Sequence, residues 1–136
     1  MPKYELTKDL ETGNALIDSE HRQLLAAIND MMDACSQGKG REKIHTTAAF
    51  LVSYVKKHFA DEEALQVKTS YPGYAAHKQF HANYTRQLIQ TADEIEKNGA
   101  NITTLSKLNQ EAGVLVSHIR TEDKKLAQHV KSQTAR

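Results

Sequence analysis

Residues 41–67 read REKIHTTAAFLVSYVKKHFADEEALQV, and this stretch carries the pattern that decides the fold. Its apolar residues recur every three or four positions, the spacing that gives an α-helix one apolar face. This stripe comprises Ile44, Ala48, Leu51, Val52, Val55 and Phe59. Pro72 and Gly73 follow, and a Pro-Gly pair is typical of turns. We therefore expect one long helix from Arg41 to about Val67.

Three further segments show the same helical periodicity. We expect them at about residues 18–37, at about residues 74–97, and from Thr103 or Thr104, as N-terminal cap, to about Lys131. No stretch alternates apolar and polar residues as a half-buried strand does. Long helices joined by short loops pack as antiparallel neighbours. The predicted fold is all-α: one domain, an up-down-up-down four-helix bundle (about 17–131) after an N-terminal leader segment (about 1–16) that packs through Tyr4 and Leu6.

Composition and charge exclude several classes of protein. The chain has 136 residues, enough for one domain with a core. Its 18 Lys and Arg against 17 Asp and Glu leave a net charge of +1, so no basic surplus favours nucleic acid. No apolar run approaches the roughly 20 residues that span a membrane, and the N-terminus lacks the apolar stretch of a signal peptide. One cysteine, Cys35, cannot form an internal disulfide. We therefore expect a cytoplasmic protein without membrane contact.

Seven histidines are the unusual feature, and five of them combine with two carboxylates. The set comprises His21, His58, Glu62, His77, His81, His118 and Asp123. The first and third helices carry their histidines near the helix start, whereas the second and fourth carry them in the later half. In an up-down bundle these positions fall at the same end. We expect His45 and His129, which lie outside this pattern, at the surface.

A buried histidine is most often a hydrogen-bonded core residue, but five imidazoles and two carboxylates together need partners that a bundle core lacks. A metal supplies them. Seven ligands are too many for one tetrahedral zinc and suit two ions that share carboxylates, with iron the natural choice. Asp123 lies five residues after His118, about 140° away on an ideal helix, so Glu122 would align better. Either the helix is locally widened, as in a π-bulge, or the two side chains approach from flanking directions.

The proposed ligands lie in a series of short motifs: His21, HFADEE at 58–63, YP at 71–72, HKQFH at 77–81 and HIRTED at 118–123. Together these motifs resemble the hemerythrin family in its bacterial form. The resemblance implies an oxo- or hydroxo-bridged di-iron centre. It assigns one iron to His77, His81 and His118, the other to His21 and His58, and the bridges to Glu62 and Asp123. It also favours Asp123 over Glu122.

The resemblance further implies that O2 binds reversibly at the iron that keeps an open position, for carriage, storage or sensing rather than catalysis. Leu24, Phe59, Leu115 and Ile119 would line an apolar pocket that admits O2 and limits water. Two alternatives stay open. One is a di-iron peroxidase, oxidase or nitric-oxide-handling enzyme, which would need an acid or base near the open iron. The other is a sensory module of a larger signalling protein.

Overall fold

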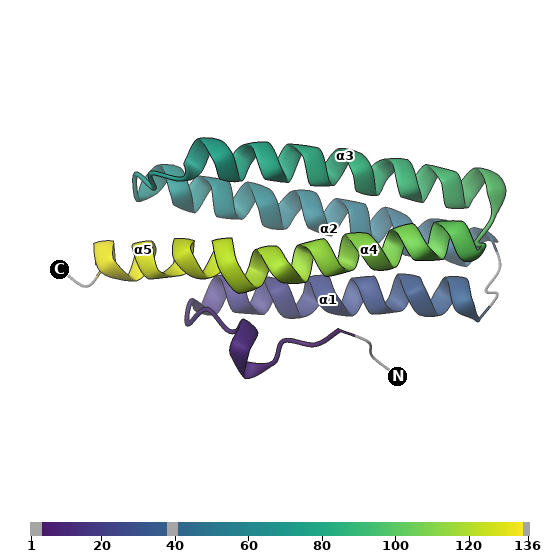
Figure 1. Cartoon of the computed structure of the whole chain (residues 1–136), viewed down its shortest axis with the longest axis horizontal. Coiled ribbons are helices and arrows are strands. Elements are labelled where there is room, and N and C mark those ends of the chain that lie inside the picture. Colours follow the sequence, from purple (N-terminus) through teal and green to yellow (C-terminus); the bar gives the residue numbers. More distant parts are fainter. Residues whose placement is uncertain (1–3, 38–40, 135–136) are drawn as a thin grey trace.

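The computed structural model describes residues 4–37 and 41–134, which form a bundle of four long antiparallel helices (Figure 1). The first three are α1 (Ala15–Ser36), α2 (Arg41–Lys68) and α3 (Tyr74–Asn98). In the fourth, α4 (Ile102–His118), the π-helical turn η2 (Ile119–Asp123) and α5 (Lys124–Thr134) follow one another without a break. The described ranges contain no strand. The all-α, up-down-up-down prediction is confirmed.

Asparagine side chains cap two of the helices. Helix α1 begins at Ala15, three residues earlier than expected, because Asn14 accepts a backbone N–H of its first turn. The expected cap of the fourth helix, Thr103 or Thr104, is wrong. Asn101 is the cap, and it accepts the N–H of Thr104 while the Thr104 hydroxyl accepts that of Asn101, each at 2.9 Å. Thr104 therefore completes a capping box from inside the helix.

The N-terminal segment lies across the outside of the bundle, beside α1 in Figure 1. It contains one turn of 3-10 helix, η1 (Lys8–Leu10), and Leu10 is buried. Tyr4 and Leu6 pack against the main core, as predicted. The Asn29 side chain on α1 holds the Tyr4 backbone through hydrogen bonds of 3.1 and 2.7 Å. Hydrogen bonds and apolar packing therefore both fix the N-terminal segment against the bundle.

The bundle topology brings four chain segments to one end of the molecule. The start of α1, the end of α2, the start of α3 and the region from η2 onward all lie on the side of Figure 1 where the C-terminus is marked. Apolar side chains fill the interior from this end to the other, in one main cluster and a smaller one around Ile17, Leu126 and Val130. None of the helices in the described ranges has the length and apolar character needed to cross a membrane.

Candidate metal centre

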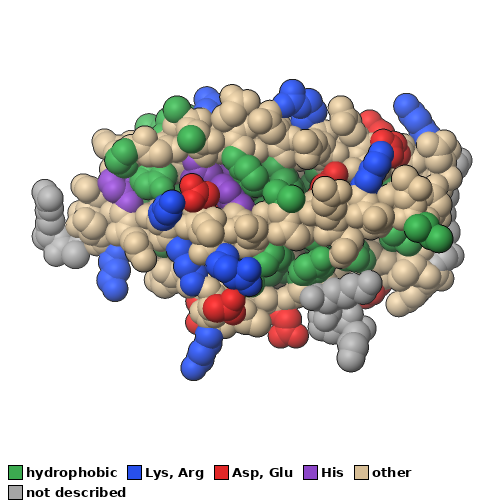
Figure 2. Space-filling model, in the orientation of Figure 1, with side chains coloured by type: hydrophobic (Ala, Val, Ile, Leu, Met, Phe, Trp, Pro, Cys, Tyr) green, Lys and Arg blue, Asp and Glu red, His purple; other side chains and the backbone are tan. Residues whose placement is uncertain are grey.

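All seven predicted metal-ligating residues lie in a single buried cluster. None is more than 6% exposed, and they come from all four helices. Figure 2 shows histidine side chains in the seam between α3 and the fourth helix, toward the C-terminal end of the chain. Burial of this many ionisable groups costs free energy unless each group has a partner.

Glu62 faces two groups of imidazoles with its two oxygens. Its Oε2 lies 3.4 Å from Nε2 of His58 and 3.7 Å from Nε2 of His21. Its Oε1 lies 3.2 Å from Nε2 of His81 and 3.8 Å from Nε2 of His77. The Glu62 carboxylate therefore lies between the pair His21 and His58 and the pair His77 and His81.

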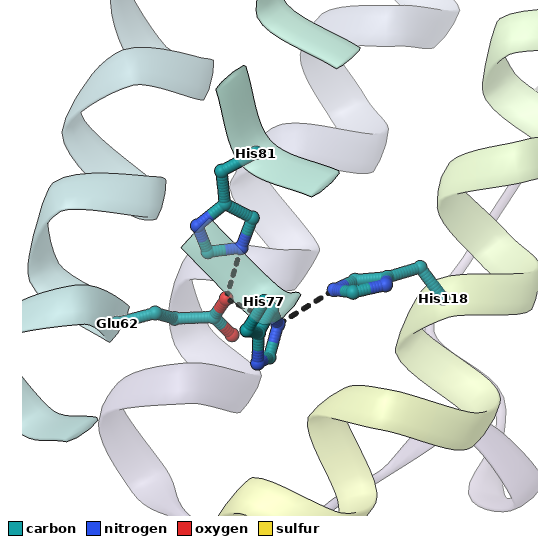
Figure 3. A group of neighbouring side chains, drawn as sticks. All are labelled: Glu62, His77, His81 and His118. Atoms are coloured by element: carbon teal, nitrogen blue, oxygen red, sulfur yellow. Dashed lines mark hydrogen bonds and ion pairs between the residues drawn. The ribbon is translucent and has the colours of Figure 1, made fainter. Parts of the chain in front are cut away.

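Asp123 repeats this arrangement from the fourth helix. Its Oδ2 lies 2.9 Å from Nε2 of His21, and its Oδ1 lies 3.0 and 3.2 Å from Nε2 of His77 and His118. Two groups of ligand atoms result, and within each group all atoms lie within 4.8 Å of one another. One group is Glu62, His77, His81 and His118, drawn in Figure 3; the other is His21, His58, Glu62 and Asp123.

The π-helical turn explains how Asp123 reaches the cluster. Across Ile119–Asp123 the backbone takes a wider turn, in which residues five apart fall one above the other. Of the two explanations that the spacing left open, the widened helix is confirmed. Glu122 points elsewhere: its side chain is 47% exposed and pairs with Lys125 at 3.2 Å.

The chemistry of the cluster fits a pair of transition-metal ions. Several buried atoms have no hydrogen-bond partner, although such atoms nearly always have one. They are Nδ1 and Nε2 of His21, Nε2 of His58 and of His81, and both carboxylate oxygens of Glu62. Metal ions would satisfy the atoms that face the centre. Imidazole nitrogen with few carboxylates suits iron, zinc or copper rather than magnesium or calcium.

The family model described as "Hemerythrin HHE cation binding domain" matches residues 12–130. The chain belongs to the hemerythrin family. It is 38% identical to the bacteriohemerythrin of Pseudomonas aeruginosa over 82 residues, which cover 60% of this chain and 53%, about half, of that protein. It is 30% identical over 109 residues to the myohemerythrin of Sipunculus nudus, with 79% and 78% of the two chains covered.

A crystal structure of a hemerythrin mutant shares the fold of this chain. The TM-score is 0.85, and the superposition covers 96% of this chain and 98% of the other at 23% identity. Because the identity is low, this similarity concerns the architecture. It confirms the four-helix bundle that the sequence predicts for this member of the hemerythrin family.

Two carboxylates that the sequence did not indicate as functional contact the outer ring nitrogens of two of these histidines. Nδ1 of His58 lies 2.8 Å from Glu20, which Lys57 also contacts at 3.0 Å, and Nδ1 of His81 lies 2.9 Å from Glu63. Such partners fix the orientation of a ligand ring and raise its basicity. Glu20 lies 38 positions from His58, so no local spacing could have indicated the contact.

Gln66 plays the same structural part for the third of these rings. Its Nε2 lies 2.8 Å from Nδ1 of His77, and the side chain is fully buried. A local signal for Gln66 did exist: together with His58 and Glu62 it forms an i, i+4, i+8 series on α2, which places it on the face that carries the ligands.

The cluster attracts positive charge. Burial and the charge of Asp123 would raise the pKa of Glu62, but the nearby imidazoles of His21, His58 and His81 hold it well below the usual range. The pKa of Asp123 is also lowered, because its contacts with His118, His21 and His77 outweigh the effect of burial, which would raise it. Burial alone would lower the pKa of His58, yet Glu20 and Glu62 raise it to about 10. Two buried carboxylates therefore favour cations at this site.

The four apolar residues predicted to line a pocket are all buried. Leu24 and Ile119 are 0% exposed, Leu115 is 1% and Phe59 is 4% exposed. The Phe59 ring stacks on the His81 ring at a centroid distance of 3.8 Å. The Phe59 ring therefore gives His81 an apolar neighbour, and electrostatic interactions are stronger in apolar surroundings than in water.

The two remaining histidines differ from each other. His45 is exposed, as predicted, and pairs with Glu96. His129 was also expected at the surface, but it is partly buried because its Nε2 donates a hydrogen bond of 2.7 Å to the Thr69 carbonyl. It holds the end of α2 against α5 and takes no part in the cluster.

Proposed function

We propose that this chain holds two iron ions and binds dioxygen reversibly as a carrier, store or sensor. The observation that carries the proposal is the placement of Glu62 and Asp123. In each carboxylate one oxygen faces the first group of histidines and the other oxygen faces the second group. Carboxylates so placed suit bridges between two ions. The names of the relatives, bacteriohemerythrin and myohemerythrin, support the same function.

The two groups of imidazoles differ in number, and this difference would give two bound ions different tasks. His77, His81 and His118 would fill one ion, whereas His21 and His58 would leave the other ion with room for a small ligand. Iron ions held by these residues would supply the electron transfer to and from dioxygen that reversible binding needs. Five neutral imidazoles against two carboxylates stabilise the ferric state less than a carboxylate-rich set does, which favours reversibility over committed oxidation.

The apolar side chains limit access of water and protons to the site. Leu24, Leu115 and Ile119 carry no acid or base, and all three are buried. A dry, apolar environment disfavours the proton transfer that would release reduced oxygen as a product. This is why we favour binding over catalysis at this site.

Iron analysis combined with optical spectroscopy tests the proposal. Protein reconstituted with Fe(II) without air should contain two irons per chain, gain a visible absorption band on exposure to O2, and lose it again under vacuum. A single zinc, no bound iron, or a band that decays irreversibly to the ferric form would contradict the proposal. The last result would favour the enzymatic alternative instead.

A further inference from the structure

Gln66 differs in chemistry from the other residues that support the ligand histidines. His58 and His81 have the carboxylates of Glu20 and Glu63 at Nδ1, whereas His77 has a neutral amide. The Gln66 side chain is 0% exposed, and only its Nε2 has a partner. Its Oε1 is buried without a hydrogen bond, an arrangement that is rare in folded proteins.

The contact at 2.8 Å has a consequence for the proton on His77. A neutral imidazole carries one N–H. If the amide N–H of Gln66 donates to Nδ1, the ring proton lies on Nε2, which has two acceptors within reach, Asp123 Oδ1 at 3.0 Å and His118 Nε2 at 2.7 Å. A ring that binds a metal through Nε2 instead carries its proton on Nδ1 and needs an acceptor there.

An amide can serve both forms of the ring, and a carboxylate cannot. Half a turn about the last side-chain bond of Gln66 exchanges Nε2 for Oε1, which then accepts from Nδ1 of His77. The oxygen that would take this part is the one without a partner. A deprotonated carboxylate has no hydrogen to donate, so it supports only the ring with the proton on Nδ1.

We propose that Gln66 is a positioning residue for His77, whose amide donates to Nδ1 when Nε2 carries the proton and turns to accept from Nδ1 when Nε2 binds metal. This inference rests on the proposed metal centre. Because the amide is neutral, it also leaves His77 a weaker electron donor than His58 and His81, whose partners are carboxylates. An ion bound by His77, His81 and His118 is therefore easier to reduce than it would be if a carboxylate replaced the Gln66 amide at Nδ1 of His77.

Nitrogen NMR of the full chain tests the two-way hydrogen bond without any measurement of oxygen binding. The probe is Zn(II), which is diamagnetic, added to chelator-treated protein. The Nδ1 signal of His77 should move from the unprotonated to the protonated range on addition of Zn(II), and the Gln66 amide signals should shift with it. In the Gln66→Glu variant Nδ1 should be protonated both with and without Zn(II). A Nδ1 signal that does not change in the parent overturns the proposal.

Metal affinity and reduction potential provide a second readout. Gln66→Leu should lower Zn(II) and Fe(II) affinity by about 10- to 100-fold, and Gln66→Glu should restore it. Gln66→Glu should also lower the reduction potential by an amount equivalent to about a tenfold change in the electron-transfer equilibrium, or ~59 mV for one electron. Gln90→Leu, at an exposed position on α3, is the matched control and should equal the parent.

The two proposals can fail separately. Normal iron and oxygen binding with identical metal affinity in Gln66→Leu and the parent would refute only the role of Gln66. A parent that shows the Nδ1 change with Zn(II) but takes up no iron would refute the di-iron function and leave the role of Gln66 intact. Circular dichroism melting of each variant identifies any that fails to fold, and Gln66→Glu then still tests the hydrogen bond.

Discussion

Replacement of Asp123 by asparagine should be far more harmful than the same change at its neighbour Glu122. Asp123→Asn keeps the shape of the side chain but removes a charge that is 1% exposed and faces three imidazoles, at 2.9, 3.0 and 3.2 Å. Loss of one partner from a buried ionic contact costs about 3–5 kcal/mol. Glu122→Gln breaks a pair with Lys125 in which the two side chains are 47% and 67% exposed, and such pairs are worth about 0–1 kcal/mol.

The assay is thermal unfolding of iron-loaded protein with an iron count on the same sample. For a chain of this size we expect Asp123→Asn to lower Tm by roughly 10–20 °C and to lose iron, and Glu122→Gln to shift Tm by at most a few degrees with the iron retained. Equal losses in the two variants, or a larger loss in Glu122→Gln, would refute the reasoning. It would mean that the π-helical turn does not direct Asp123 to the metals.

Three further predictions follow from the same site. His77→Ala should lose iron from the three-histidine side, whereas His58→Ala should retain part of its iron and lose reversible oxygenation. Iron counts and gas-exchange spectra measure both effects. Full oxygen binding in His58→Ala would contradict the assignment. Ile119→Glu places an acid among apolar side chains and should speed autoxidation, and Leu115→Ala should speed it more mildly by admitting solvent. Stopped-flow decay of the oxygenated absorption band measures the autoxidation rate. Unchanged rates in both variants would show that Leu115 and Ile119 do not line the oxygen pocket. Removal of iron by a chelator should lower Tm, and Fe(II) added without air should restore it in a concentration-dependent way, because a ligand of the folded state stabilises it by mass action.

Local patterns were sufficient to predict the helices and most of the proposed ligands. The apolar stripe of α2 and the turn at Pro72 and Gly73 depend on neighbours in the chain, and the structure has α2 end one residue from the predicted position. The pairs His58 with Glu62 and His77 with His81 are visible for the same reason: residues four apart share a helix face. The predicted cap of the fourth helix was wrong because Thr104 is a capping residue that acts here from inside the helix, as the partner of Asn101 in a capping box. Asn is the stronger N-cap residue of the two, so the sequence did offer a signal for Asn101.

Contacts between helices were beyond the reach of the sequence. Periodicity predicted four amphipathic helices with the candidate ligands toward one end, because helix formation and the facing of side chains are local properties. Only the structure showed that a π-helical turn directs Asp123 inward, and that Glu20 contacts Nδ1 of His58 and Gln66 contacts Nδ1 of His77. These contacts join residues that are 11, 38 and 46 positions apart in sequence, for Gln66 with His77, Glu20 with His58 and Asp123 with His77, and they form only when the apolar faces pack together.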